Sequence, residues 1–155
     1  MRKRKPKVRF IAPDPRYADP LVTQFVNNLM LAGKKSVAFQ VFYDAMDIVK
    51  EKVEESEYEA FKAALANVMP QVEVRSKRIG GANFQIPTEI RGKRKMSIGM
   101  KWLIKFARAR SGKGIAEKLG AEIIAASKGE GAAVKRKIDT HKMAESNRAF
   151  AHFRA

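Results

Sequence analysis

The sequence predicts a mainly α fold: a compact bundle of about six helices with one protruding β-hairpin and a basic N-terminal arm. Six segments carry apolar residues at helical spacing. The segment 72–90 instead alternates apolar and polar residues around a glycine-rich turn. Residues 2–9 are basic, contain no acid and have no helical period. Together these three observations indicate the fold class.

Residues 1–18 are predicted to form a basic extended arm, because prolines interrupt them and no apolar stripe recurs. A helix over about 20–32 follows. Asp19 before Pro20 is typical of an N-cap followed by the first helical residue. Gly33 then supplies a stop signal. Asp14 is interpreted as a turn residue.

Two further helices are predicted over about 35–54 and 57–69. The second of them has a start signal, because Ser56 and Glu59 are spaced as a capping box. Pro70 follows its predicted end, where a proline cannot continue a helix.

The hairpin prediction rests on two alternating runs, one beginning at Val72 and one containing Phe84 and Ile86. The stretch Ile79–Asn83 between them is rich in turn residues. Pro87 cannot donate a ladder hydrogen bond, so its strand has a free edge. Because a lone hairpin is marginal in water, we expect this one to lean on helices or on a ligand.

The last three helices are predicted over about 94–110, 115–128 and 132–149. In the helix over 94–110, four cations share one stripe and apolar residues including Trp102 lie broadly opposite. We therefore expect Trp102 to pack in the core rather than stack on a base. The chain has no internal repeat and no linker, so residues 1–155 are predicted to form a single domain.

The 155 residues contain 32 Lys and Arg, 16 Asp and Glu and no Cys, and the net charge is +16. Without cysteine, a disulfide scaffold, a thiolate metal site and a cysteine nucleophile are excluded. No apolar stretch is long enough to span a membrane, so the expected compartment is the cytoplasm. Such a charge repels itself unless an anionic partner neutralises it.

The charges are segregated along the chain. Residues 2–9 and 91–113 contain many cations and no acid, and Arg75, Lys77 and Arg78 form a third cluster. By contrast, residues 44–59 hold 7 of the 16 acids. A basic side and an acidic side favour a surface apposed to a polyanion, with the acidic region turned away.

No catalytic arrangement is evident, so we predict a protein that is not an enzyme and has no cofactor and no metal site. Ser111–Gly114 lacks two required positions of a phosphate-binding loop and is interpreted as an interhelical turn. His141 and Glu145 lack the second histidine of a metalloprotease helix, so we expect His141 to touch polar partners. Asp44 and Asp47 are interpreted as part of a solvated acidic face.

Several short strings of the chain are distinctive. They include Asp19-Pro20, Gly33-Lys34-Lys35 and Gln85-Ile86-Pro87, and the C-terminal residues from Lys142 to His152. The most specific is the hairpin string from Val72 to Ala82. With these strings, the chain resembles the seventh ribosomal protein of the bacterial small subunit over nearly its whole length. The resemblance implies a six-helix domain with a β-ribbon arm.

The same resemblance implies a structural protein that binds small-subunit ribosomal RNA first and nucleates assembly of the head domain. It also implies a place at the subunit interface, near the exit-site tRNA and the path of the mRNA. The implied neighbours are the ninth and eleventh small-subunit proteins, and no membrane is involved.

We expect the cations to displace counterions from RNA phosphates, and the shape of a junction to supply specificity. The predicted rRNA-binding residues are Arg2, Lys3, Arg4, Lys5, Lys7, Arg9, Lys34, Lys35, Arg75, Arg78, Arg91, Arg94, Lys95, Lys101, Lys105, Arg108, Arg110, Lys113, Lys142 and Arg148. The hairpin residues expected near tRNA and mRNA are Lys77, Arg78, Ile79, Gly80, Gly81, Ala82, Asn83 and Phe84. For Phe84, stacking on a base competes with packing under the hairpin, and packing is favoured.

Two other functions fit the charge. A DNA-compacting protein would bind duplex DNA and structured RNA alike, because phosphate contacts carry no sequence information. A nucleic-acid enzyme would use the acidic segment 44–59 with a metal ion, and Asp44 would be needed for turnover. Neither function explains the hairpin string.

Overall fold

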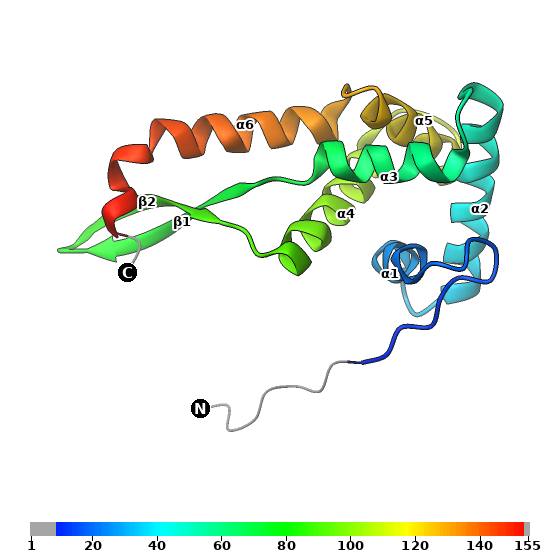
Figure 1. Cartoon of the computed structure of the whole chain (residues 1–155), viewed down its shortest axis with the longest axis horizontal. Coiled ribbons are helices and arrows are strands. Elements are labelled where there is room, and N and C mark those ends of the chain that lie inside the picture. The colour runs from blue at the N-terminus through cyan, green and yellow to red at the C-terminus, as the bar shows by residue number, and fades with distance from the viewer. Residues whose placement is uncertain (1–8, 154–155) are drawn as a thin grey trace.

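The computed structural model describes residues 9–153. The elements, in chain order, are α1 (Pro20–Leu29), α2 (Lys35–Lys52), α3 (Glu57–Val68), β1 (Val72–Ile79), β2 (Ala82–Glu89), α4 (Gly92–Ala109), α5 (Ile115–Ser127), α6 (Ala132–Ser146) and the 3-10 helix η1 (Arg148–Phe153). The predicted mainly α class with one hairpin is confirmed (Figure 1). The predicted contacts Arg2, Lys3, Arg4, Lys5 and Lys7 lie outside the described residues.

One hydrophobic core joins all six α-helices. Its centre is an aromatic cluster in which Phe25, Phe42 and Phe61 meet pairwise, with ring centroids 5.1–5.5 Å apart. Helix α5 packs against α2, α3 and α4. Gly120 allows this approach, because a Cβ atom there would lie 3.1 Å from the carbonyl oxygen of Ala45 on α2. Within the described chain, no helix is long and apolar enough to cross a membrane.

In the first half of the chain, one predicted helix end and one predicted capping interaction are wrong. Helix α1 ends at Leu29 rather than near residue 32, because the backbone at Met30 turns to a non-helical ψ of 137°. Ala32 and Gly33, with positive φ angles of 50° and 74°, then complete the turn. Ser56 precedes α3 as predicted, but its side chain makes no capping hydrogen bond. Glu59 instead pairs with Lys62 at 2.7 Å, so the capping box does not form.

The last predicted helix is also too long. Helix α6 ends at Ser146, and the chain then tightens into η1. This change brings Phe150 and Phe153 onto Phe84 of the hairpin, with ring centroids 5.3 and 5.4 Å away. The packing interpretation of Phe84 is therefore confirmed.

The hairpin has a tighter turn than the five-residue stretch predicted. Ile79 pairs with Ala82, which leaves Gly80 and Gly81 as a two-residue turn. Both have positive φ, 55° and 89°, as hairpin turns of this length require. The hairpin projects from one end of the molecule and α6 runs along it (Figure 1). It leans on helices, as expected.

Candidate nucleic-acid interface

Helix α4 is the element around which the exposed cations gather. Its buried face consists of Gly99, Met100, Leu103, Ile104 and Ala107. The predicted stripe, Arg94, Lys101, Lys105 and Arg108, is exposed on the other side. This amphipathic division places a line of positive charge on a rigid scaffold. Trp102 is partly buried against the core, as expected from the sequence.

The first of three grooves along α4 lies at the base of the hairpin. It has a volume of about 440 Å³ and is lined by Arg75, Thr88, Glu89, Arg91 and Arg94.

Glu73 organises this groove by holding the guanidinium groups of Arg75 and Arg94 at 2.5 and 2.9 Å. Burial pushes the pKa of Glu73 upward, but the hydrogen bonds from Arg94 and Arg75 outweigh burial and lower it below its ordinary value. The carboxylate thus stays charged and fixes two forked donors that can grip phosphate.

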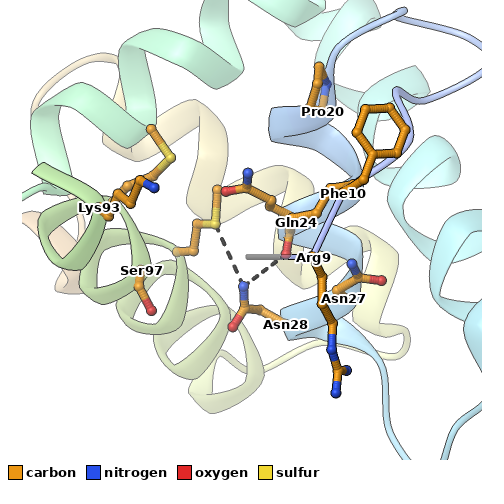
Figure 2. A pocket seen from close by; sticks show the side chains of 11 residues that line it. Arg9, Phe10, Pro20, Gln24, Asn27, Asn28, Lys93 and Ser97 are labelled. Atoms are coloured by element: carbon orange, nitrogen blue, oxygen red, sulfur yellow. Dashed lines mark hydrogen bonds between the residues drawn. The ribbon is translucent and has the colours of Figure 1, made fainter. Parts of the chain in front are cut away.

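The second groove lies between residues 9–11, α1 and the N-terminal half of α4, and its volume is about 900 Å³. Figure 2 shows Gln24, Asn27 and Asn28 on α1, with Lys93 and Ser97 across the groove on α4. Arg9 stands on the chain segment that leads toward α1 (Figure 2). Lys93 and Arg94 are neighbours in the chain, so this groove and the hairpin-base groove flank the same turn of α4.

A turn held by the buried carboxylate of Asp14 anchors the segment that leads from Arg9 to α1. The Asp14 carboxylate accepts hydrogen bonds from the backbone N–H groups of Arg16 and Tyr17 at 3.0 and 2.9 Å. It also accepts one from the Tyr43 hydroxyl at 2.6 Å, and burial followed by this bond raises the pKa of Tyr43 to about 12. The prediction of an extended arm over residues 1–18 is therefore wrong for residues 14–18, because Asp14 is buried and forms a turn there.

Asp19 begins α1 as predicted. Its carboxylate accepts the Leu21 N–H at 2.7 Å. The Tyr58 hydroxyl donates to the other carboxylate oxygen. The interpretations of Asp14 as a turn residue and of Asp19 as a cap are both confirmed.

The third groove lies at the C-terminal end of α4. Lys34 and Arg108 line it together with apolar residues that include Leu31 and Val37, and the volume is about 370 Å³. Arg108 donates to the carbonyl oxygen of Leu29 at 2.9 Å, where it caps the C-terminal end of α1. Lys35 is exposed next to this groove.

The acidic segment lies away from the hairpin-base groove. The turn between α2 and α3 is at the end of the molecule remote from the hairpin (Figure 1). Within the acidic segment, Asp47 on α2 pairs with Arg16 at 2.5 Å. This hydrogen bond is the main reason that the pKa of Asp47 is lowered. Across residues 9–153, no three His, Asp or Glu side chains are close enough to hold a metal ion.

Several predicted site residues are not brought into the grooves. Arg110 pairs through Nε with the fully buried Glu122 at 2.5 Å. Lys95 donates to the side chain of Gln71. Lys113 is exposed in the loop after α4, and Lys142 and Arg148 are exposed on α6 and η1.

The hairpin tip carries the remaining predicted residues. Lys77 donates to the carbonyl oxygen of Phe153 at 3.3 Å. Arg78, Gly80, Gly81, Ala82 and Asn83 are exposed, and Ile79 is half-buried. His141 accepts a hydrogen bond from the Gln71 N–H at 3.0 Å, so its predicted polar contact is confirmed.

The sequence analysis missed Phe10, Gln24, Asn27 and Lys93 as groove residues. One available signal was the polar run Gln24, Asn27 and Asn28 within five residues of an otherwise apolar helix. No local signal points to Phe10, because its exposure depends on how the anchored turn directs the preceding chain.

Comparison with known proteins gives a consistent result. A family model described as ribosomal protein S7p/S5e matches residues 1–148. A protein of Cytophaga hutchinsonii named small ribosomal subunit protein uS7 is 60% identical over 154 residues, which cover 99% of both chains. Proteins with the same name from Flavobacterium psychrophilum and Porphyromonas gingivalis are 61% and 62% identical, again over 99% of both chains.

Proposed function

This chain belongs to the ribosomal protein S7p/S5e family of structural, non-enzymatic components of the small ribosomal subunit, and from that premise we propose that its α4 face binds the head domain of small-subunit rRNA. As a part of the bacterial small subunit, the protein is cytoplasmic. The observation that carries the proposal is the series of three cation-bearing grooves along one rigid helix.

The binding free energy comes largely from counterion release. Phosphates crowd together where RNA helices meet, and each lysine or arginine that approaches them frees condensed cations. Arg94 and Arg75 are already oriented by Glu73, so they lose little conformational entropy on binding. Lys101, Lys105 and Lys34 extend the contact toward the far end of α4.

Head assembly follows from rigidity in this proposal. The grooves are built from residues 9–11, α1, α2, α4, the first residue of α5 and the hairpin base. The helices among them share one core, and an ion pair joins α4 to the hairpin. A fixed set of cations holds two or more RNA segments at one angle, which favours later folding of the head domain around them. Specificity comes from that shape, because the A-form major groove is too deep and narrow for side chains to read its sequence.

The hairpin tip has a separate role in this proposal, beside the exit-site tRNA and the mRNA path. Gly80 and Gly81 have no side chain, so the tip can approach another backbone closely. Arg78 and Asn83 are exposed there and lie outside the α4 grooves. The ninth and eleventh small-subunit proteins are the proposed protein neighbours.

The test is filter binding of the full chain to a transcript of the head domain, with duplex DNA as competitor, at several salt concentrations. We expect binding that resists the competitor. Lys101→Gln with Lys105→Gln should lower the slope of log affinity against log salt by about 2. The matched control is Lys50→Gln with Lys52→Gln, because these exposed lysines lie on α2 beside the acidic turn. The control should bind as the wild type does.

Equal affinity for duplex DNA and for the transcript would contradict the proposal and favour the DNA-compacting function. For the hairpin tip, Arg78→Gln should leave transcript affinity within about twofold while weakening cross-linking to exit-site tRNA in assembled subunits. If Arg78→Gln instead abolished transcript binding, the tip would be an rRNA anchor and the division of roles would be wrong.

A further inference from the structure

We propose that the groove between residues 9–11, α1 and α4 is a pocket for one unpaired nucleobase, which stacks on Phe10 and is contacted at its edge by the amides of Gln24 and Asn27. This inference rests on the proposed rRNA-binding function and extends it from phosphate contacts to a base contact.

Phe10 is the first observation. Its side chain is 90% exposed, whereas the next most exposed large apolar residue of the described chain, Leu31, is 64% exposed. It lines the groove and follows Arg9 in the chain (Figure 2). Sites for single-stranded nucleic acid use exposed aromatic rings on basic surfaces, because every base has a π-face that can stack.

The amides are the second observation. Within residues 9–153, no hydrogen-bond partner is found for the side-chain amides of Gln24 and Asn27, although both line the groove. Asn28 differs, since its amide nitrogen donates to the Gln24 carbonyl oxygen at 2.8 Å and contacts the Met100 sulfur at 3.7 Å. Two amides therefore remain free to bond to a base edge. One Asn or Gln amide can both donate a hydrogen bond to a base and accept one from it.

The walls and rim of the groove fit the same ligand. Ile11, Met96 and Met100 provide apolar surface for the flat faces of a base. Arg9 and Lys93 stand at the edge, where the flanking phosphates would lie. The volume of about 900 Å³ is at the upper end of small-ligand sites and leaves room for the attached sugar.

Only an unpaired base can use this pocket, because a paired base is stacked between its neighbours and its Watson–Crick edge is already hydrogen-bonded. The ligand is therefore a nucleotide from a loop, bulge or junction of the head-domain RNA. The pocket would read such a nucleotide beside phosphates that the α4 cations already hold.

The test measures binding of the full chain to the head-domain transcript, together with chemical probing of unpaired nucleotides. Phe10→Leu removes the π-face and keeps an apolar side chain, so we expect affinity to fall by about 5- to 100-fold. The salt slope should stay unchanged, because no phosphate contact is lost. Phe10→Trp should restore affinity. One unpaired nucleotide should be protected by the wild type and become reactive with Phe10→Leu and with Gln24→Ala.

The control is Ile138→Ala, which shortens an exposed apolar side chain on α6, away from the groove. It should match the wild type in affinity and in footprint. Wild-type affinity and an unchanged footprint for Phe10→Leu would overturn the pocket. A loss of affinity in Phe10→Leu together with a shallower salt slope would also overturn it, because residues 9–11 would then act by positioning phosphate contacts. Failure of the wild-type chain to bind the transcript would instead overturn the proposed function.

Discussion

The buried carboxylate of Glu122 holds together the corner where α4, α5 and α6 meet. Its side chain has no exposed surface. One oxygen pairs with Arg110 Nε at 2.5 Å, and the other accepts the Ala133 N–H at 3.0 Å in the first turn of α6. Arg110 therefore neutralises an internal charge. The basic stretch around it predicted an RNA contact, but our proposed interface does not include Arg110.

Replacing Arg110 by Ala should lower the free energy of unfolding by about 3 kcal/mol, because a buried carboxylate loses its partner. Urea unfolding followed by circular dichroism measures this change. Lys113→Ala is the control, since that exposed lysine lies in the next loop and should change stability by less than about 0.5 kcal/mol. If both variants lost the same small free energy of unfolding, the buried Glu122 carboxylate would not need Arg110 as its partner, and this prediction would be wrong.

The hairpin is an element whose position depends on the C-terminal part of the chain. Phe84 packs between Phe150 and Phe153, and the first residue before β1, Gln71, donates its N–H to His141 on α6. Two strands alone would be marginally stable. Contacts at both ends of the hairpin thus convert it from a loose ribbon into a fixed projection of the bundle.

This docking should depend on pH through His141. Burial, with a contribution from the charge of Lys137, lowers the pKa of His141 below 6.5. The neutral ring accepts the Gln71 N–H, and a protonated ring cannot. The stability that His141 contributes is therefore fully present above pH 6.5 and is lost as pH falls through the lowered pKa.

We expect the stability difference between wild type and His141→Gln to shrink as pH falls from 7 to 5, measured by urea unfolding. His152→Gln is the control, because this exposed histidine lies on η1 and contacts the Ala149 carbonyl oxygen. It should keep the pH dependence of the wild type. A difference between wild type and His141→Gln that does not vary with pH would contradict the role of the neutral ring.

The molecule as a whole separates its charges by distance. The hairpin and the acidic turn between α2 and α3 lie at opposite ends (Figure 1). The net charge of +16 is nevertheless unbalanced. Without an anionic partner, the cations along α4 repel one another, and this repulsion lowers the stability of the free protein.

Added salt should therefore stabilise the free protein. Raising NaCl from 0.05 to 0.5 M should increase the free energy of unfolding by about 1 kcal/mol and Tm by about 2–4 °C. Replacing Lys135, Lys142 and Arg148 by Gln should reduce the increase, because these exposed cations add to the repulsion. A fall in Tm with salt would mean that ion pairs such as Arg16–Asp47 outweigh the repulsion.

The sequence by itself determined the elements and the overall charge of this protein. Helices are set by apolar residues a few positions apart, and the hairpin by alternation around Gly80 and Gly81, so both signals are local. The basic stripe of α4 was predictable for the same reason. The exact ends of α1 and α6 were not, because the extended backbone at Met30 ends α1 and aromatic packing at Phe150 accompanies the end of α6.

Only the tertiary structure decided which cations face a partner and which are held inside the protein. Arg75 and Arg94 are 19 positions apart in the chain but converge on Glu73, whereas Arg110 turns inward to Glu122. Arg108 caps a helix that ends 79 positions earlier. Phe10 is exposed because a turn buried around Asp14 fixes where the preceding chain goes. Such pairings depend on distances in space, which periodicity along the chain does not contain.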